Sequence, residues 1–383
     1  MKKVLFVLAW LCLPLTFQTA HAQESASSIS PLETLAKQAL IMEAQTGDIL
    51  YAKNAEEQMP TSSMSKVLTM YLVFDAIKNG KIGLDSMVTV SDNARAQVGS
   101  RMFVNAGQEV SVNDLAQGVI VQSGNDAAVA LAEAVSGTEA SFAELMNAKA
   151  KELGMTHSHF MNATGLPDPQ HYSTAGDLAL LARALVTDFP EHYHYYSQKE
   201  FTFNNIKQGN RNPLLYRNMG VDGIKTGHTD AAGYGLIASA LRENRRVIVV
   251  VNGLSSMQER ADEPAKLIEW AYREYGLYSY LDPTKPAGEA KVWLGVQPTV
   301  PVAAAKSVQL SLPRAQKDDV KVSYQVNGEI EAPIVKGQVV GQATVSAPGK
   351  ETIEIPLVAI QDVAKMGLPQ ALWAKFKRAI GKE

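Results

Sequence analysis

The stretch YGLIASALRENRRVIVVVNGL, residues 234–254, decides the fold of this chain. Two apolar runs rich in strand-forming residues flank the polar group RENRR, and such a pattern predicts a β-hairpin. An amphipathic helical pattern, DEPAKLIEWAYREYG (262–276), follows it. A second hairpin pattern, ALIMEAQTGDILYAKN (39–54), lies at the other end of the same region.

Helical patterns fill most of the sequence between the two hairpins. Apolar residues recur at helical spacing from Met64 to about Ile77, and residues 111–185 are mostly helical in pattern. The loops SGND (123–126) and NATGLPDPQHYST (162–174) interrupt them. We therefore expect an α+β fold in which helices flank one antiparallel sheet, over residues 30–280.

The sequence changes character at YLDPTKPAGEA (280–290). Short β-rich runs separated by Pro, Gly and Asn follow, which predicts a small all-β domain over residues 288–363. Residues 366–383 predict an amphipathic helix with aromatic residues on its apolar face and basic residues around the remainder. Such a helix can lie in a membrane interface or dock onto its own domain, and the residues alone leave both open.

The N-terminus has the pattern of a signal peptide. Two lysines precede an apolar run over residues 4–15, and AHA (20–22) fits the small-x-small cleavage pattern. The run is too short for a membrane-spanning helix, which needs about 20 residues. We expect cleavage after residue 22, which removes Cys12, the only cysteine, and so excludes disulfides and a thiol nucleophile. The net charge of −3 gives no indication of nucleic-acid binding.

Ser63-Met64-Ser65-Lys66 is the only Ser-x-x-Lys sequence in the chain. Residues at i and i+3 share one face of a helix, so the Lys66 amine can reach the Ser63 hydroxyl. A neutral lysine can accept the proton of a serine nucleophile. The alternative is that Thr61 and Ser62 cap a core helix while Lys66 is solvated, because so short a motif also arises by chance.

Lys225-Thr226-Gly227 is the only Lys-Thr-Gly sequence, and it lies just before the hairpin that starts near Tyr234. On an edge strand, the lysine and threonine side chains could bind a substrate carboxylate. We expect Gly227 to let a ligand approach the backbone closely. A peptide could then pair with this edge as an added strand.

Three Ser-x-Asn sequences begin at Ser91, Ser111 and Ser123. Ser91 and Ser111 have the surroundings of helix caps or turns. Ser123-Gly124-Asn125 instead interrupts two apolar helical patterns, so its polar side chains are expected to face something specific. We choose Ser123 and Asn125 for this reason.

These three motifs, in this order, resemble those of penicillin-binding proteins and serine β-lactamases. The wider resemblance, over residues 30–383, is to the low-molecular-mass penicillin-binding proteins that are D-alanyl-D-alanine carboxypeptidases. It includes the stretch FMNATGLPDPQHYSTAGDL (160–178), the β-rich domain and the amphipathic tail. Ser91-Asp92-Asn93 matches the β-lactamase spelling but lies too close to Ser63.

The resemblance implies a serine peptidase that removes the terminal D-alanine from peptidoglycan stem pentapeptides and is inhibited by β-lactams. Ser63 attacks the carbonyl between the last two D-alanines, and Lys66 accepts its proton. Repulsion from Lys225 would favour the neutral form of Lys66. Ser123 relays a proton to the leaving D-alanine, and Asn125 binds the peptide or holds Lys66.

The substrate-binding residues follow from the same resemblance. Lys225 and Thr226, with Gly227 beside them, would bind the terminal carboxylate, and Arg260 resembles a further carboxylate-binding arginine. The backbone N–H groups of Ser63 and His228 would form an oxyanion hole.

The resemblance also implies export, with the C-terminal helix holding the protein on the periplasmic face of the cytoplasmic (inner) membrane. It implies no cofactor. The His-x-His pairs at 157/159 and 192/194 lack a third ligand nearby in sequence, so we expect no metal site. One alternative is a serine β-lactamase, although the Glu-x-x-Leu-Asn context of its deacylating glutamate is missing. The other is a non-catalytic protein that binds stem peptides and shapes the wall.

Overall fold

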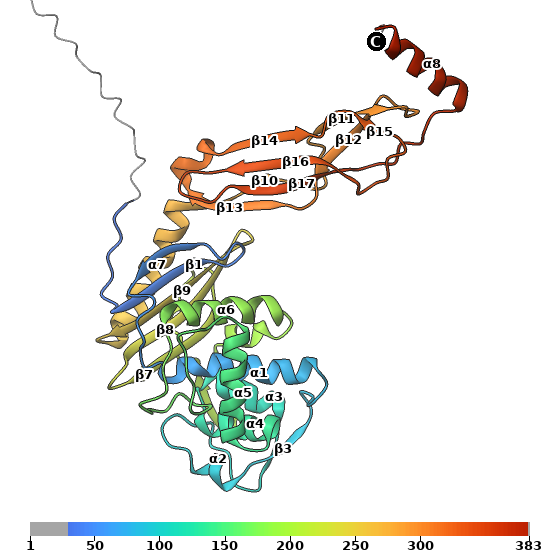
Figure 1. The fold of residues 1–383 in the computed structure, drawn as a ribbon. Helices are drawn as coiled ribbons and strands as arrows, with labels where there is room; N and C mark the ends of the chain where they lie inside the picture. The colour runs from blue at the N-terminus through green and yellow to red at the C-terminus, as the bar shows by residue number, and fades with distance from the viewer. Residues whose placement is uncertain (1–29, 382–383) are drawn as a thin grey trace, which may run out of the picture.

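The computed structural model describes residues 30–381, so the signal peptide expected over residues 1–22 lies outside it. Five strands form one antiparallel sheet in the order β2-β1-β9-β8-β7 (Figure 1). Both expected hairpins are present, and β7 forms an edge. The strands are β1 (Gln38–Glu43), β2 (Ile49–Lys53), β7 (Val221–Thr229), β8 (Gly233–Arg242) and β9 (Arg245–Leu254).

A two-residue turn joins β8 to β9. Its residues Glu243 and Asn244 have φ values of 48° and 63°. Two consecutive positive φ values characterise the hairpin turn whose twist matches that of the flanking strands. The polar group between the two apolar runs therefore forms a tight turn.

Strand β9 is buried on both faces because helices cover both sides of the sheet. Val247, Val249 and Val251 pack with α7 (Met257–Glu274), whereas Ile248 and Val250 belong to the core of the opposite helical layer. Successive side chains on a strand point to opposite faces. Because both faces of β9 are buried, its sequence is continuously hydrophobic and does not alternate between apolar and polar residues.

The helical layer lies on the sheet face opposite α7 (Figure 1). Its shorter elements join and border the helices. The helices are α1 (Lys66–Lys78), α2 (Asp92–Ala96), α3 (Val112–Val121), α4 (Asn125–Ser136), α5 (Glu139–Glu152) and α6 (Ala175–Asp188). The shorter elements are 3₁₀ turns η1 (Ser62–Ser65), η2 (Tyr193–Ser197) and η3 (Pro213–Tyr216), and strands β3 (Met87–Thr89), β4 (Glu109–Ser111), β5 (Glu200–Phe203) and β6 (Ile206–Gly209).

A second, β-rich part follows α7 with no intervening linker, since β10 begins at Tyr275. Strand β10 pairs with β13, and a six-stranded sheet has the order β14-β16-β17-β12-β11-β15. These strands enclose a separate apolar core. The bounds are β10 (Tyr275–Leu281), β11 (Gly288–Trp293), β12 (Thr299–Ala304), β13 (Val308–Pro313), η4 (Arg314–Asp319), β14 (Lys321–Val326), β15 (Ile330–Glu331), β16 (Val339–Ser346) and β17 (Ile353–Ala359).

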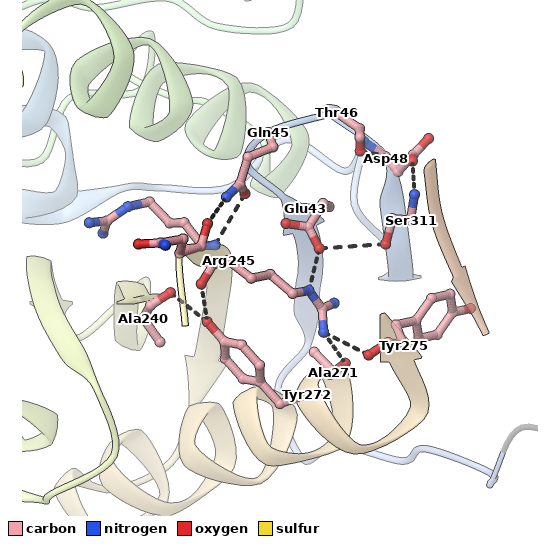
Figure 2. A network of polar contacts seen from close by, with 12 residues as sticks. Glu43, Gln45, Thr46, Asp48, Ala240, Arg245, Ala271, Tyr272, Tyr275 and Ser311 are labelled. Atoms are coloured by element: carbon pink, nitrogen blue, oxygen red, sulfur yellow. Dashed lines mark hydrogen bonds and ion pairs between the residues drawn. The ribbon is translucent and has the colours of Figure 1, made fainter. Parts of the chain in front are cut away.

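A buried polar network joins the two parts (Figure 2). Arg245 Nε lies 2.7 Å from Glu43 Oε2, and Arg245 Nη1 donates to the carbonyl of Tyr275 at 2.7 Å. On the β13 side, the Ser311 backbone N–H donates to Asp48 Oδ2 at 3.3 Å. Contacts from the first sheet thus reach both strands of the β10–β13 pair.

Helix α8 (Leu368–Ala379) lies at the far end of the β-rich part (Figure 1). Arg378 anchors it, with Nη1 2.7 Å from Glu329 Oε2 and the guanidinium 4.3 Å from the ring centre of Trp293. The large apolar side chains of this end are more than 45% exposed: Leu368, Leu372, Trp373, Phe376 and Ile380. The helix therefore presents its apolar face outward.

Candidate active site

Ser63 lies in the 3₁₀ turn η1, and Lys66 is the first residue of α1. The sequence had suggested a single helix through both residues. Side chains at i and i+3 are eclipsed in a 3₁₀ turn, so the two groups still meet. Lys66 Nζ lies 3.0 Å from Ser63 Oγ. Ser63 itself is half-buried and is therefore open to a ligand on one side.

Lys66 is completely buried. Its Nζ also donates to Asn125 Oδ1 at 2.6 Å and to the carbonyl of Thr164 at 2.5 Å. Burial and then the charge of Arg211 lower the pKa of Lys66 to about 7, although Asp126 and Glu139 oppose this shift. An ammonium in water has a pKa near 10.4, so at neutral pH a large fraction of Lys66 can accept a proton.

Arg211, rather than the expected Lys225, is the charge that lowers the pKa of Lys66. Burial first, and then repulsion from Lys66, Arg211 and Arg260, lower the pKa of Lys225 well below its ordinary value. Arg211 is thus a shared source of positive potential for both lysines. It donates to Ser100 Oγ from the loop before η3. No motif in the sequence identifies it, because arginines are common in such loops.

Ser123 and Asn125 lie where α3 gives way to α4. Asn125 connects Lys66 to the loop between α2 and β4, since its Nδ2 donates to the carbonyl of Val98 at 2.6 Å. Ser123 has a φ of 63°, a conformation that costs a non-glycine residue roughly 1–3 kcal/mol. Its buried Oγ has no hydrogen-bond partner among residues 30–381. Buried hydroxyls are usually satisfied, so this group is available to a ligand.

The other two Ser-x-Asn sequences are helix caps, as predicted. Ser91 Oγ accepts from the Ala94 N–H at 2.9 Å at the start of α2. Ser111 Oγ accepts from the Asp114 N–H at 3.0 Å at the start of α3. Their hydroxyls are occupied by helix ends, unlike that of Ser123.

Lys225, Thr226 and Gly227 lie on the edge strand β7 and are buried. The structure gives a reason for glycine at position 227 that the sequence did not indicate. A β-carbon at Gly227 would lie 2.8 Å from the carbonyl oxygen of Thr61 and 3.0 Å from Met64 Cγ. Its missing side chain therefore lets η1 pack against β7, which holds the nucleophile turn beside the strand. Close approach of a ligand to this backbone stays a prediction.

Arg260 and His228 both lie against the ring of Tyr234. The Arg260 guanidinium is 5.3 Å from the Tyr234 ring centre, and the His228 and Tyr234 rings are 4.0 Å apart. Arg260 is buried, and its Nε has no partner among the described residues. With Arg211, and with Lys225 as a further hydrogen-bond donor, it makes one end of the site cationic, which suits a carboxylate.

Gly165 positions the nucleophile turn from the other side. Its φ is +77°, and a β-carbon there would lie 1.8 Å from the Ser62 carbonyl oxygen. The preceding residue, Thr164, supplies the carbonyl that accepts from Lys66. Both belong to the loop 162–174 that the sequence placed between helices, but nothing in the sequence indicated that it would contact η1.

A buried hydrogen-bonded chain ties the same loop to η1. The Met161 N–H donates to His171 Nδ1 at 3.2 Å, so the ring carries its proton on Nε2. Nε2 lies 2.7 Å from Ser65 Oγ, which lies 2.6 Å from Thr61 Oγ1. Burial lowers the pKa of His171 to about 4, so the ring is neutral at physiological pH.

A cavity of about 450 Å³ opens beside the nucleophile turn. Its walls are residues 58–62, the loop from Gly165 to Tyr172, and Thr229 at the end of β7. It adjoins Ser62 and so extends the site away from the cationic end.

One group of side chains could in principle hold a metal. Ligand atoms of Glu56, His157 and Asp177 lie within 4.8 Å of one another. His157 Nδ1 is 3.4 Å from Glu56 Oε2, and Asp177 Oδ2 already accepts from the His157 N–H and from Ser158 Oγ. The His157–Glu56 contact and the two hydrogen bonds to Asp177 account for the group, and we assign it no metal.

Comparison with known proteins identifies this arrangement. The family model described as D-alanyl-D-alanine carboxypeptidase matches residues 23–256. The chain belongs to this family of carboxypeptidases. A second family model, the penicillin-binding protein 5 C-terminal domain, matches residues 280–365.

Carboxypeptidases of this family resemble the chain over most of its length. D-alanyl-D-alanine carboxypeptidase DacA of Haemophilus influenzae is 37% identical, with 93% of this chain and 92% of that protein covered. Penicillin-binding protein 5 of the same organism has a TM-score of 0.77 at 38% identity, covering 88% of this chain and 100% of that one. Penicillin-binding protein D2 of Listeria monocytogenes, solved in a cefotaxime-bound form, has a TM-score of 0.59 at 33% identity, covering 63% and 99%.

The carboxypeptidase family and fold expected from the sequence are thus confirmed, and a β-lactamase is not the family that matches. Within residues 30–381, none of the helices combines the length and the hydrophobicity needed to cross a membrane.

Proposed function

We propose that Ser63 is the nucleophile of this carboxypeptidase and that Lys66 is its base. The observation that carries the proposal is the 3.0 Å contact between the completely buried Lys66 Nζ and Ser63 Oγ, together with a Lys66 pKa of about 7. Ser63 Oγ bonds to the carbonyl carbon of the penultimate D-alanine while its proton moves to Lys66. The N–H groups of Ser63 and His228 stabilise the oxyanion, a contribution of about 3–4 kcal/mol.

The acyl-enzyme forms when the amide C–N bond breaks. Lys66 passes the proton that it took from Ser63 to the leaving nitrogen through Ser123, whose buried hydroxyl has no protein partner among the described residues, and Lys66 is neutral again. Asn125 fixes Lys66 during this step. Water then adds to the ester while Lys66 accepts a proton from it. The bond between the carbonyl carbon and Ser63 Oγ breaks, Lys66 returns the proton to Ser63 Oγ, and the shortened peptide leaves.

The terminal carboxylate of the substrate binds at the cationic end. Lys225 and Thr226 lie on the edge strand β7, where an extended peptide can add as a further strand. Arg260 and Arg211 add positive charge at the same end. A β-lactam carries a carboxylate and an acylating carbonyl, so we expect it to occupy the same site and acylate Ser63.

The test is release of D-alanine from a peptide ending in D-Ala-D-Ala, run with intact-mass detection of a penicillin adduct. We expect one D-alanine per peptide and a persistent adduct, both abolished in Ser63→Ala. Fast penicillin hydrolysis without D-alanine release would mean a β-lactamase instead. An adduct without peptide turnover would favour the stem-peptide-binding alternative.

We further propose that the protein is exported and that α8 holds it to the periplasmic face of the cytoplasmic membrane. Five large apolar side chains at this end are exposed, and Lys375 and Lys377 lie on the same helix. An apolar face flanked by lysines suits a membrane interface with anionic lipids. The β-rich part would then separate the active site from the lipid surface.

A further inference from the structure

The cavity beside the nucleophile turn differs in charge from the rest of the site. Asp168 is the only formally charged side chain among the described residues that line it, since His171 is neutral. The other end carries Arg211, Arg260 and Lys225. The site is therefore cationic at one end and acidic at the other.

The direction of β7 decides which part of a substrate reaches the cavity. Thr226 lies at the carboxylate-binding end, and Thr229 lines the cavity. A strand rises about 3.3 Å per residue, so the two are roughly 10 Å apart along the edge. An extended peptide whose terminal carboxylate binds near Lys225 would thus place the residue upstream of D-Ala-D-Ala beside Thr229.

The walls of the cavity are built to hold a side chain in place. Gly165 packs on η1, and the His171–Ser65–Thr61 chain ties the loop to the same turn. Asp168 belongs to this loop, where its Oδ1 accepts from the Gln170 N–H at 2.8 Å. The position of Asp168 relative to Ser63 is thereby fixed through buried contacts.

We propose that this cavity is the subsite for the side chain of the residue preceding D-Ala-D-Ala, and that Asp168 makes it select a side chain with a free ammonium group. The inference rests on the proposed function, because it assumes that the carboxylate binds near Lys225. Asp168 is half-exposed, so the expected preference is modest, about two- to fivefold in kcat/KM.

The test uses two peptides that differ by one charge. Both end in L-Lys-D-Ala-D-Ala with a blocked N-terminus, and the lysine ε-amine is free in one and acetylated in the other. We expect the full-length protein to favour the free amine by that factor. Asp168→Asn should bring the ratio close to one, because asparagine keeps the oxygen that accepts from Gln170 but has no charge.

Asp230→Asn is the matched control. Asp230 is exposed and lies between Thr229 and Ala231, but it is not among the residues that line the cavity. Asp230→Asn should keep the wild-type ratio of kcat/KM for the two peptides. If both variants lose this preference equally, the effect comes from the overall charge of the protein, and the assignment of Asp168 is overturned. Equal turnover of both peptides by the wild type would overturn the subsite while leaving the carboxypeptidase function intact. Turnover of neither peptide would overturn the proposed function itself.

Discussion

Gly165 lies directly against the peptide group of Ser62, so closely that a β-carbon on Gly165 would come within 1.8 Å of the Ser62 carbonyl oxygen. Gly165→Ala must therefore displace the turn that carries Ser63. A misplacement of about 1 Å can cost a hundredfold in rate, and we expect at least that loss in the second-order rate of acylation by penicillin. Stopped-flow measurement with a chromogenic β-lactam checks it.

Gly154→Ala is the control that separates the steric clash at Gly165 from the strain of placing alanine at a positive φ. Gly154 has a φ of +82°, but no atom within 4 Å would meet its β-carbon. We expect it to lose only about 1–2 kcal/mol of stability and to acylate at the wild-type rate. Similar rates in the two variants would show that the packing of Gly165 is irrelevant to Ser63.

Acylation should depend on pH through Lys66. Only the neutral amine accepts the Ser63 proton, so the rate should fall about tenfold per pH unit below the pKa of about 7 and level off above it. In Arg211→Gln one cause of the low Lys66 pKa is removed, so the midpoint of the pH profile of the acylation rate should move to higher pH. The second-order acylation rate, measured from pH 5 to 9, gives both midpoints.

Arg273→Gln serves as the control for this shift. Arg273 is an exposed partner of Glu274 at the distal end of α7, so its loss should leave the midpoint unchanged. A wild-type midpoint in Arg211→Gln would contradict the assigned electrostatic role, whatever happens to substrate affinity.

His171 should make the protein less stable in mild acid. Its pKa is lowered to about 4 in the folded protein, against about 6.5 for a free imidazole. The unfolded chain therefore binds this proton first, and stability that is complete above pH 6.5 is lost as the pH falls towards 4, by up to roughly 3 kcal/mol. Urea unfolding at pH 7 and pH 4.5 should show a smaller difference for His171→Gln than for the wild type.

His194→Gln, at an exposed position in η2, should retain the wild-type difference. If His171→Gln also keeps the wild-type difference in unfolding free energy between pH 7 and pH 4.5, a group other than His171 causes the loss of stability in acid.

The buried Glu43–Arg245 pair should be more important to stability than any surface pair. Arg245→Met leaves the Glu43 carboxylate buried without its cation, which typically costs 3–5 kcal/mol. Adding Glu43→Leu should recover most of that loss, because the uncompensated charge is then gone. Arg242→Met, which breaks the more exposed pair with Glu269, should cost about 1 kcal/mol or less. Urea denaturation measures all four proteins, and a double variant as unstable as Arg245→Met would refute the account.

Membrane binding should depend on the exposed aromatic residues of α8. Trp373 and Phe376 stack with ring centres 5.8 Å apart. Each side chain contributes roughly 1.5–3 kcal/mol when removed from water, so replacing both by alanine should weaken binding to phosphatidylglycerol-containing vesicles at least tenfold in co-sedimentation. Tyr324→Ala, an exposed aromatic on β14, is the control. Equal binding by all three proteins would mean that α8 is not the anchor.

Features that depend on residues close together in the sequence could be predicted from the sequence alone. The apolar runs around Glu243 and Asn244 predicted the β8–β9 hairpin, and the spacing of Ser63 and Lys66 predicted their contact. The Ser91 and Ser111 caps were recognisable for the same reason.

Contacts between distant segments could not be read in this way. Thr164 accepts from Lys66 across 98 positions, and His171 reaches Ser65 across 106. Neither residue carries a local signature of its partner. Gly227 shows the same limit, because its motif was visible but the segment packed against it was not.

Helix α7 passes directly into β10, and the Glu43–Arg245–Ser311 network reinforces this junction. The junction limits how far the distance between Ser63 and α8 can vary. If α8 rests on a lipid surface, Ser63 is carried at a nearly constant elevation above it, and the search for substrate becomes two-dimensional. Stem peptides that cross that layer of the wall are trimmed, whereas those nearer to or farther from the lipid are spared. The length of the β-rich part would then determine the distance from the membrane at which stem peptides are trimmed. A longer β-rich part would move the trimmed layer outward.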